Sequence, residues 1–176
     1  TTTYEQDEVG KDRGYEYSRT GNPTRTALEM SLAALEGAEF GRAFASGMAA
    51  EDTILRTLNP GDHIVMGNDA YGGTFRLISK VLARFNISWT AVDLSDISAT
   101  EAAITKNTRL FWMETPSNPL LSVVDIGVLA SIAHDHGALC VVDNTFATPY
   151  LQQPLTLGAD FVIHSATKYI GGHSDV

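Results

Sequence analysis

The chain has 176 residues, and its 44% hydrophobic content is enough to bury the core of one domain or slightly more. Twelve basic residues against 21 acidic ones give a net charge of −9, which argues against nucleic acid or an anionic membrane surface as a partner. The single cysteine, Cys140, lies inside an apolar run typical of a buried thiol, which excludes a disulfide framework. The sequence has no signal-peptide pattern and no apolar run long enough to cross a membrane, which favours the cytoplasm.

Residues 1–22 are polar and lack helical or strand periodicity, so we expect an N-terminal arm that reaches a neighbouring subunit. A helix is predicted next, because Asn22 suits an N-cap, Pro23 suits the first helical position and Gly37 suits the end. The apolar residues between them recur at helical spacing: Leu28, Leu32 and Leu35.

Short β-type runs and helical segments alternate from there on. The β-type runs are residues 63–66, 88–92, 110–113, 139–142 and 161–163, and the helical segments are 49–58, 74–85, 99–105 and 126–136. Residues 45–50 favour a strand exit, a turn of small residues and a helix start. The alternation predicts the α/β class, with a mostly parallel sheet flanked by helices, which binds ligands at the carboxyl ends of its strands. The long connection 115–125, with Pro116 and Pro119, favours a functional loop.

Lys168 follows the last predicted strand and is flanked by the hydroxyls of Ser165 and Thr167, which suit an anionic phosphate. A lysine at such a position is commonly a surface residue whose stem packs on apolar neighbours. Asp143 follows the strand before it and is equally suited to capping the next turn. Together, however, an amine and a carboxylate at strand ends are what pyridoxal phosphate chemistry needs. The amine holds the aldehyde as a Schiff base, and the acid keeps the ring nitrogen protonated.

Weaker signals come from three other segments. Gly47 and Met48 open a predicted helix whose backbone N–H groups can bind phosphate, although an ordinary β–α turn has the same pattern. Tyr71 can stack on a flat ring, or it can simply be a boundary tyrosine with a solvated hydroxyl. Tyr17 and Arg19 lie in the arm, where arginine suits a phosphate and is otherwise a solvated charge. The histidines lack metal-ligand spacing, so no metal site is expected.

In order and spacing, six segments resemble the cystathionine γ-synthase/γ-lyase family of pyridoxal-phosphate-dependent enzymes. They are residues 17–24 (YSRTGNPT), 46–49 (SGMA), 71–74 (YGGT), 114–119 (ETPSNP), 142–145 (VDNT) and 165–169 (SATKY). The resemblance implies fold type I, with an aspartate-aminotransferase-like large domain over residues 23–176. It also implies a smaller C-terminal domain outside this chain, so we expect a piece of a longer protein.

The resemblance also implies a role for each residue singled out above. Lys168 would hold the cofactor and move protons, Asp143 would pair with the pyridinium nitrogen, and Tyr71 would stack on the ring and assist proton transfer. The amides of Gly47 and Met48 and the hydroxyls of Ser165 and Thr167 would hold the phosphate. Tyr17 and Arg19 would bind the phosphate of an adjacent subunit. Asn118 would lie near the phenolic oxygen of the cofactor, and Glu114 would lie on the substrate side. Members of the family are typically homotetramers, built as dimers of dimers with shared sites.

Within the family, the motifs most resemble bacterial γ-synthases. This implies γ-replacement, in which an O-acylhomoserine and cysteine give cystathionine for methionine biosynthesis. A γ-lyase, which splits cystathionine into cysteine, 2-oxobutyrate and ammonia, shares the pattern at residues 71–74, and a non-catalytic ligand-binding module on the same fold is a third reading. Gly73 stands where a methionine γ-lyase would have a cysteine. The resemblance also implies that the arginine that binds the substrate carboxylate lies in the C-terminal domain outside this chain.

Overall fold

The computed structural model describes residues 1–174 and divides the chain into two compact units, Thr1–Ala43 and a second one that starts at Phe44. The first unit contains a short antiparallel hairpin, β1 (Gln6–Glu8) and β2 (Lys11–Asp12), and the helix α1 (Pro23–Glu36). The hairpin was not predicted. The assignment of residues 1–22 to an arm that reaches another subunit stays a prediction.

Helix α1 begins and ends as the sequence predicts. The side chain of Asn22 accepts hydrogen bonds from the backbone N–H groups of Thr24 and Arg25 at 2.9 and 3.2 Å. At the other end, Gly37 adopts a left-handed conformation with φ of 68°, which a residue with a side chain rarely adopts. Both caps satisfy backbone groups that a helix terminus leaves without partners, so the predicted boundaries are confirmed.

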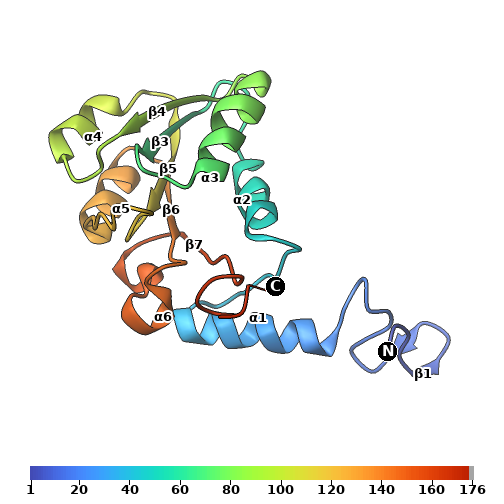
Figure 1. Cartoon of the computed structure of the whole chain (residues 1–176). Coiled ribbons are helices and arrows are strands. Elements are labelled where there is room, and N and C mark those ends of the chain that lie inside the picture. Colours follow the sequence, from blue (N-terminus) through green and yellow to red (C-terminus); the bar gives the residue numbers. More distant parts are fainter. Residues whose placement is uncertain (175–176) are drawn as a thin grey trace. The chain divides into compact units, whose positions relative to one another are not determined.

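The second unit is built on a five-stranded parallel sheet with the order β4-β3-β5-β6-β7 (Figure 1). The strands are β3 (His63–Gly67), β4 (Ser88–Val92), β5 (Thr108–Glu114), β6 (Leu139–Asp143) and β7 (Phe161–Ile163). The helices are α2 (Gly47–Leu55), α3 (Gly72–Arg76), α4 (Ile97–Ala103), α5 (Ile126–Asp135) and α6 (Thr148–Leu151), with a 3₁₀ turn at Pro154–Leu157. The predicted strands and the parallel α/β architecture are confirmed.

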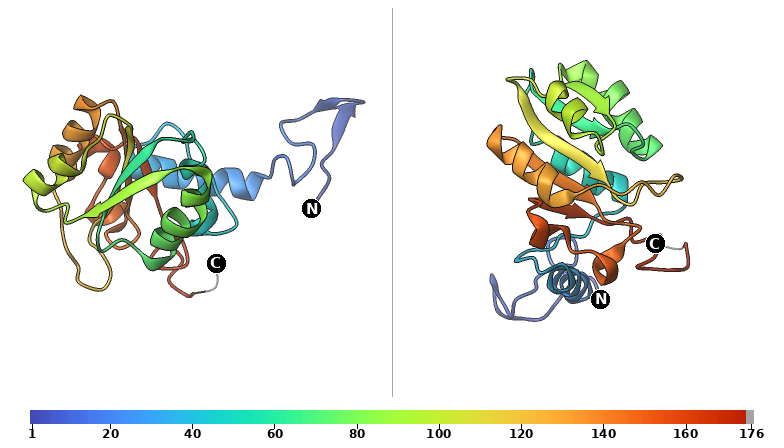
Figure 2. Two further views of the ribbon diagram at one scale, coloured as in Figure 1. Left: turned by 90° about the horizontal axis from the view of Figure 1, so that it is seen from above. Right: turned by 90° about the vertical axis from the view of Figure 1, so that its left-hand side faces the viewer.

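Helices cover both faces of this sheet, as the turned views in Figure 2 show. The two faces follow from the alternation of side chains along each strand. One face carries Val65, Phe111, Met113, Cys140 and Val142 and packs against α4 and α5; the other carries Ile64, Met66, Leu110, Trp112 and Val141 and packs against α2 and the helical segment 77–85. Cys140 is fully buried, and burial raises the pKa of its thiol to about 12, as expected for a core cysteine.

The predicted helical segment 74–85 is confirmed, but it is irregular: α3 passes into a π-helical turn at Leu77–Val81 and then a 3₁₀ turn at Leu82–Phe85, which buries Ile78 and Leu82 against the sheet. The strand expected to end just before α2 was a wrong prediction. Residues 38–46 form no strand before α2. Extended backbone becomes a strand only when a neighbour completes its hydrogen bonds, and none of the described strands pairs with this segment.

Within residues 1–174, no helix is long and apolar enough to cross a membrane. The same residues contain no cluster of three histidine, cysteine or acidic side chains arranged to hold a metal ion.

Candidate active site

The strand order places a natural binding position at the carboxyl ends of β3 and β5. The chain steps from β3 outward to β4, then crosses to the other side of β3 and continues through β5, β6 and β7. Open parallel sheets bind ligands where the direction of winding reverses in this way. Tyr71 follows β3, Glu114 ends β5, Asp143 ends β6 and Lys168 follows β7, so all four lie at this edge.

Asp143 is the buried carboxylate of the site, with 7% of its surface exposed. Its neighbours in register are Glu114 on β5 and Ile163 on β7. Its Oδ1 accepts a hydrogen bond of 3.0 Å from the backbone N–H of Thr145, so it does cap the following turn. Burial raises its pKa, while the Thr145 hydrogen bonds and the positive charges of His164 and Lys168 act in the opposite direction.

Lys168 lies in the turn that follows β7 and is exposed. Its Nζ donates a hydrogen bond of 3.2 Å to Oγ of Ser165, and the backbone N–H of Ser165 donates one of 2.8 Å to Oγ1 of Thr145. The bond between Ser165 and Thr145 connects the turn after β7 to the turn after β6. The amine and the buried carboxylate are thereby held at neighbouring strand ends, close enough for the lysine charge to act on the pKa of Asp143.

The N-terminus of α2 lies beside the same turn. Ser46 caps the helix by accepting a hydrogen bond of 3.1 Å from the N–H of Ala49, and Gly47 and Met48 are its first two residues. The N–H groups of the first helical turn have no acceptor within a helix and attract anions. A β-carbon at Gly47 would lie 3.2 Å from Cβ of Ser165, so the glycine allows the two backbones to approach closely.

Tyr71 is connected to β5 through its backbone. Its N–H donates a hydrogen bond of 2.7 Å to Oε2 of Glu114, while 44% of the residue remains exposed. A β-carbon at Gly73 would overlap the Tyr71 ring and lie 2.8 Å from Sδ of Met48, so this glycine is needed for the packing of both side chains. Burial and the negative charge of Asp143 raise the pKa of Glu114 to about 7.

Sequence reasoning missed two buried residues beside the site, Glu51 on α2 and Thr74 on α3. Oγ1 of Thr74 donates a hydrogen bond of 2.7 Å to Oε2 of Glu51. Burial raises the pKa of Glu51 to about 7, the Thr74 hydrogen bond lowers it, and the charge of Asp143 raises it further. One signal was available: Glu51 precedes Leu55 by four residues and therefore lies on the apolar face of a predicted helix.

The other four predicted site residues lie in the loop 115–125, in the turn after β7 and in the first unit. Asn118 is exposed in the loop 115–125, where the Thr115–Pro116 and Asn118–Pro119 peptide bonds are both cis. Thr167 lies in the turn between Ser165 and Lys168 and is half-buried. Tyr17 and Arg19 belong to the first unit, where the Arg19 guanidinium lies 5.1 Å from the centre of the Tyr17 ring. The roles of these four residues stay predictions.

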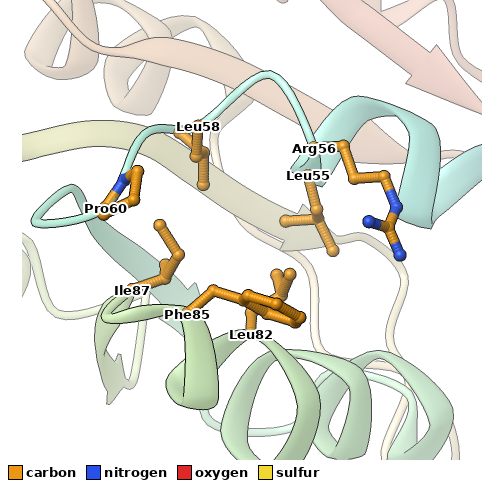
Figure 3. A pocket seen from close by; sticks show the side chains of 7 residues that line it. All are labelled: Leu55, Arg56, Leu58, Pro60, Leu82, Phe85 and Ile87. Carbon is orange, nitrogen blue, oxygen red and sulfur yellow. The ribbon is translucent and has the colours of Figure 1, made fainter.

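An apolar pocket of about 370 Å³ lies at the opposite edge of the sheet (Figure 3). Pro60 precedes β3 and Ile87 precedes β4, which puts the pocket at the amino ends of these strands. Its only charged lining residue is Arg56, which forms an ion pair of 2.7 Å with Asp52. The pocket therefore offers none of the acid–base groups found at the carboxyl ends.

The groups at the carboxyl ends fit pyridoxal phosphate by their chemistry. The Lys168 amine suits its aldehyde, and the buried Asp143 carboxylate suits its ring nitrogen. The exposed aromatic ring of Tyr71 suits the flat ring of the cofactor. The N-terminus of α2, which lies close to the Ser165 hydroxyl, suits its phosphate. The residues present therefore fit the cofactor that the sequence predicts.

The chain belongs to the family of Cys/Met metabolism PLP-dependent enzymes, whose model matches residues 1–176. It is 62% identical over 178 residues to a cystathionine gamma-synthase of Mycobacterium tuberculosis and 56% identical over 175 residues to a cystathionine gamma-lyase of Bacillus subtilis. These matches cover 100% and 99% of this chain, and 46% of each relative. The chain therefore spans about half the length of the curated relatives it matches.

A solved structure agrees with the fold. The crystal structure of metB from Corynebacterium glutamicum matches with a TM-score of 0.95 and 58% sequence identity, over 100% of this chain and 46% of that one. The expected family, the type I fold and the cofactor class are confirmed. Relatives with different names match at similar identity, so membership of the family does not select one reaction.

Proposed function

We propose that the protein containing this chain catalyses γ-replacement, forming cystathionine from an O-acylhomoserine and cysteine. The observation that carries the proposal is the placement of Lys168 and Asp143 at the ends of neighbouring parallel strands, with the charge of the lysine acting on the carboxylate. The choice among family reactions is supported by the 62% identity to a γ-synthase, against 56% to a γ-lyase.

Bound pyridoxal phosphate would supply an electron sink for the substrate's reacting carbons. In this proposal the Lys168 amine holds the cofactor's aldehyde, and once released it takes the proton from the substrate α-carbon. Asp143 holds the proton of the ring nitrogen. Its buried carboxylate has a raised pKa in the chain alone, and a cationic ring beside it would favour the ionised form.

The remaining predicted residues bind and orient the cofactor in this proposal. The amides of Gly47 and Met48 and the hydroxyls of Ser165 and Thr167 hold the phosphate, and Tyr71 stacks on the ring and assists proton transfer. Asn118 contacts the phenolic oxygen and Glu114 faces the substrate. Tyr17 and Arg19 complete the phosphate site of an adjacent subunit, which makes the dimer the catalytic unit of a cytoplasmic homotetramer. This arrangement rests on the family resemblance.

The second candidate is a γ-lyase, favoured by a relative of that name at 56% identity. The two reactions share their early proton transfers and differ in what reacts at the γ-carbon. A non-catalytic module on the same fold is disfavoured, because such a module has no need of both Lys168 and Asp143, and both are present.

The discriminating experiment offers both reactions to the full-length enzyme in parallel. One assay supplies O-acetyl- or O-succinylhomoserine with cysteine and follows cystathionine, and the other supplies cystathionine and follows 2-oxobutyrate. We expect γ-replacement to dominate. Efficient cleavage of cystathionine without γ-replacement would reject the γ-synthase proposal in favour of the γ-lyase.

A further inference from the structure

A buried hydrogen bond joins the two helices that begin at the candidate site. Oγ1 of Thr74 on α3 donates to Oε2 of Glu51 on α2 at 2.7 Å, and the two residues are 1% and 3% exposed. Glu51 is the fifth residue of α2, which begins at Gly47, and Thr74 is the third residue of α3, which begins at Gly72. The bond therefore spans the two helices close to their N-termini.

Each bonded residue is close in the chain to a residue of the site. Met48 precedes Glu51 by three residues within α2, a spacing that puts the two side by side on that helix. Tyr71 is the residue immediately before α3, three residues before Thr74. Met48 and Tyr71 themselves meet at Gly73, where a β-carbon would overlap the tyrosine ring and lie 2.8 Å from Sδ of Met48. A change in the spacing of α2 and α3 would therefore change the packing of both Met48 and Tyr71.

A carboxyl group is a costly way to join two helices in a core. Burial opposes its ionised form, and two more carboxylates, Asp143 and Glu114, lie close enough to interact with it. Leu55, four residues further on the same helix, fills its position with an apolar side chain. Packing alone would be served equally well by such a residue at position 51. A directional hydrogen bond, in contrast, fixes distance and orientation as well as filling space.

We propose that Glu51 and Thr74 are positioning residues: their hydrogen bond sets the spacing between the N-terminus of α2, which receives the cofactor's phosphate, and Tyr71, which stacks on its ring. This inference rests on the proposed function insofar as the cofactor lies between these two groups. It assigns a role to Thr74, the last residue of the segment 71–74, and to Glu51, which lies outside the six segments. The pair acts through Met48, Gly73 and Tyr71 without touching the cofactor.

The test uses the full-length protein and replaces Thr74 by valine, which keeps the shape and removes the hydroxyl. Glu51→Gln is the conservative counterpart, because its amide oxygen can still accept the Thr74 hydrogen bond. Thr108→Val is the matched control. Thr108 is also fully buried, and its hydroxyl lies 2.9 Å from Nδ1 of His63 at the amino ends of the strands, away from the site.

Three quantities are measured for each variant: the thermal midpoint of the apoprotein, the dissociation constant of pyridoxal phosphate, and the visible circular dichroism of the bound cofactor, which reports the orientation of the ring. We expect Thr74→Val to weaken cofactor binding by about tenfold and to change the dichroism band. Glu51→Gln should stay within about twofold of the wild type. Thr108→Val should lower the thermal midpoint and leave both cofactor signals unchanged.

Two results would overturn the inference, and they differ in what else they reject. If Thr74→Val binds pyridoxal phosphate with wild-type affinity and an unchanged dichroism band, the pair is structural only and the proposed function stands. If the wild-type protein itself fails to bind pyridoxal phosphate, both the inference and the proposed function are wrong.

Discussion

Glu114, the last residue of β5, accepts a hydrogen bond of 2.7 Å from the backbone N–H of Tyr71, which stands immediately before α3. The bond fixes the start of α3 to the carboxyl end of a central strand. Tyr71 keeps 44% of its surface exposed, so its ring remains available to a ligand while its backbone is held. A partly buried carboxylate thus serves as a structural acceptor at the position where the substrate is expected.

The first prediction separates the acceptor role of Glu114 from its charge. Glu114→Ala removes the partner of the Tyr71 N–H and should weaken pyridoxal phosphate binding by roughly fivefold, equivalent to about 1 kcal/mol. Glu114→Gln keeps an acceptor oxygen and should bind the cofactor nearly as well as the wild type. Fluorescence titration of both variants with the cofactor provides the comparison. Equal losses in the two would mean that the charge matters and the acceptor does not.

The second prediction concerns the dependence of stability on pH. The pKa values of Glu51 and Glu114 are raised from 4.5 to about 7. Between about pH 4.5 and about pH 7, the folded apoprotein keeps protons on these two carboxyl groups that the unfolded chain has released. Stability therefore falls as pH rises through this window and levels off above it.

Urea unfolding of the apoprotein at pH 5 and pH 8 measures this effect. Replacing Glu51 by glutamine removes one titrating group, so the loss of stability between the two pH values should shrink by about 1–2 kcal/mol. Glu101→Gln, on an exposed part of α4, serves as the control and should lose as much stability as the wild type. An undiminished loss in Glu51→Gln would contradict the assignment of a raised pKa to Glu51.

A third prediction follows from the space around Gly73. Gly73→Ala places a β-carbon against the Tyr71 ring and Sδ of Met48, and should cost about 1–3 kcal/mol of stability and reorient the tyrosine. Gly127→Ala is the matched control. The nearest atom to a β-carbon there is a side-chain oxygen at 3.4 Å, so replacing a helical glycine should stabilise the protein by about 0.5–1 kcal/mol. Denaturation midpoints and cofactor dichroism distinguish the two, and a neutral Gly73→Ala would show that the contact can relax.

The fourth prediction sets stability against activity at Asp143. An asparagine at position 143 keeps an oxygen that can accept the Thr145 hydrogen bond. It also removes the buried carboxyl group of Asp143, whose pKa is raised by burial. The Asp143→Asn apoprotein should therefore be about 1 kcal/mol more stable than the wild type at pH 8. It should also turn over substrate about 10²–10³-fold more slowly, because the ring nitrogen loses its charged partner. A variant that is less stable, or fully active, would contradict this account.

The strands and the caps of α1 could be predicted because their signals are local. Runs such as 161–163 are apolar and bounded by turn residues, and Asn22 and Gly37 act on backbone groups only a few positions away. The strand expected before residue 46 was wrong, since a strand also depends on a partner that local sequence does not reveal.

The site residues that could be predicted are likewise those with a local signal in the sequence. Asp143 could be predicted because it directly follows an apolar run, and Lys168 because it lies five residues after another such run; a parallel sheet brings the ends of these runs together. The contact between Glu51 and Thr74 joins residues 23 positions apart across two helices, and no periodic pattern encodes it. Asn118 was named from the family resemblance, and Tyr17 and Arg19 from the chemistry of arginine as well; the roles of all three stay predictions.

The most direct test of the account is the identity of the residue that binds the cofactor. The full-length protein, incubated with pyridoxal phosphate, is treated with sodium borohydride, digested and analysed by peptide mass spectrometry. We predict that the added cofactor mass appears on the peptide containing Lys168, and that Lys168→Ala abolishes both this label and the absorbance band near the edge of the visible range. A label on another lysine, or a Lys168→Ala protein that keeps the band, would contradict the assignment of the active site.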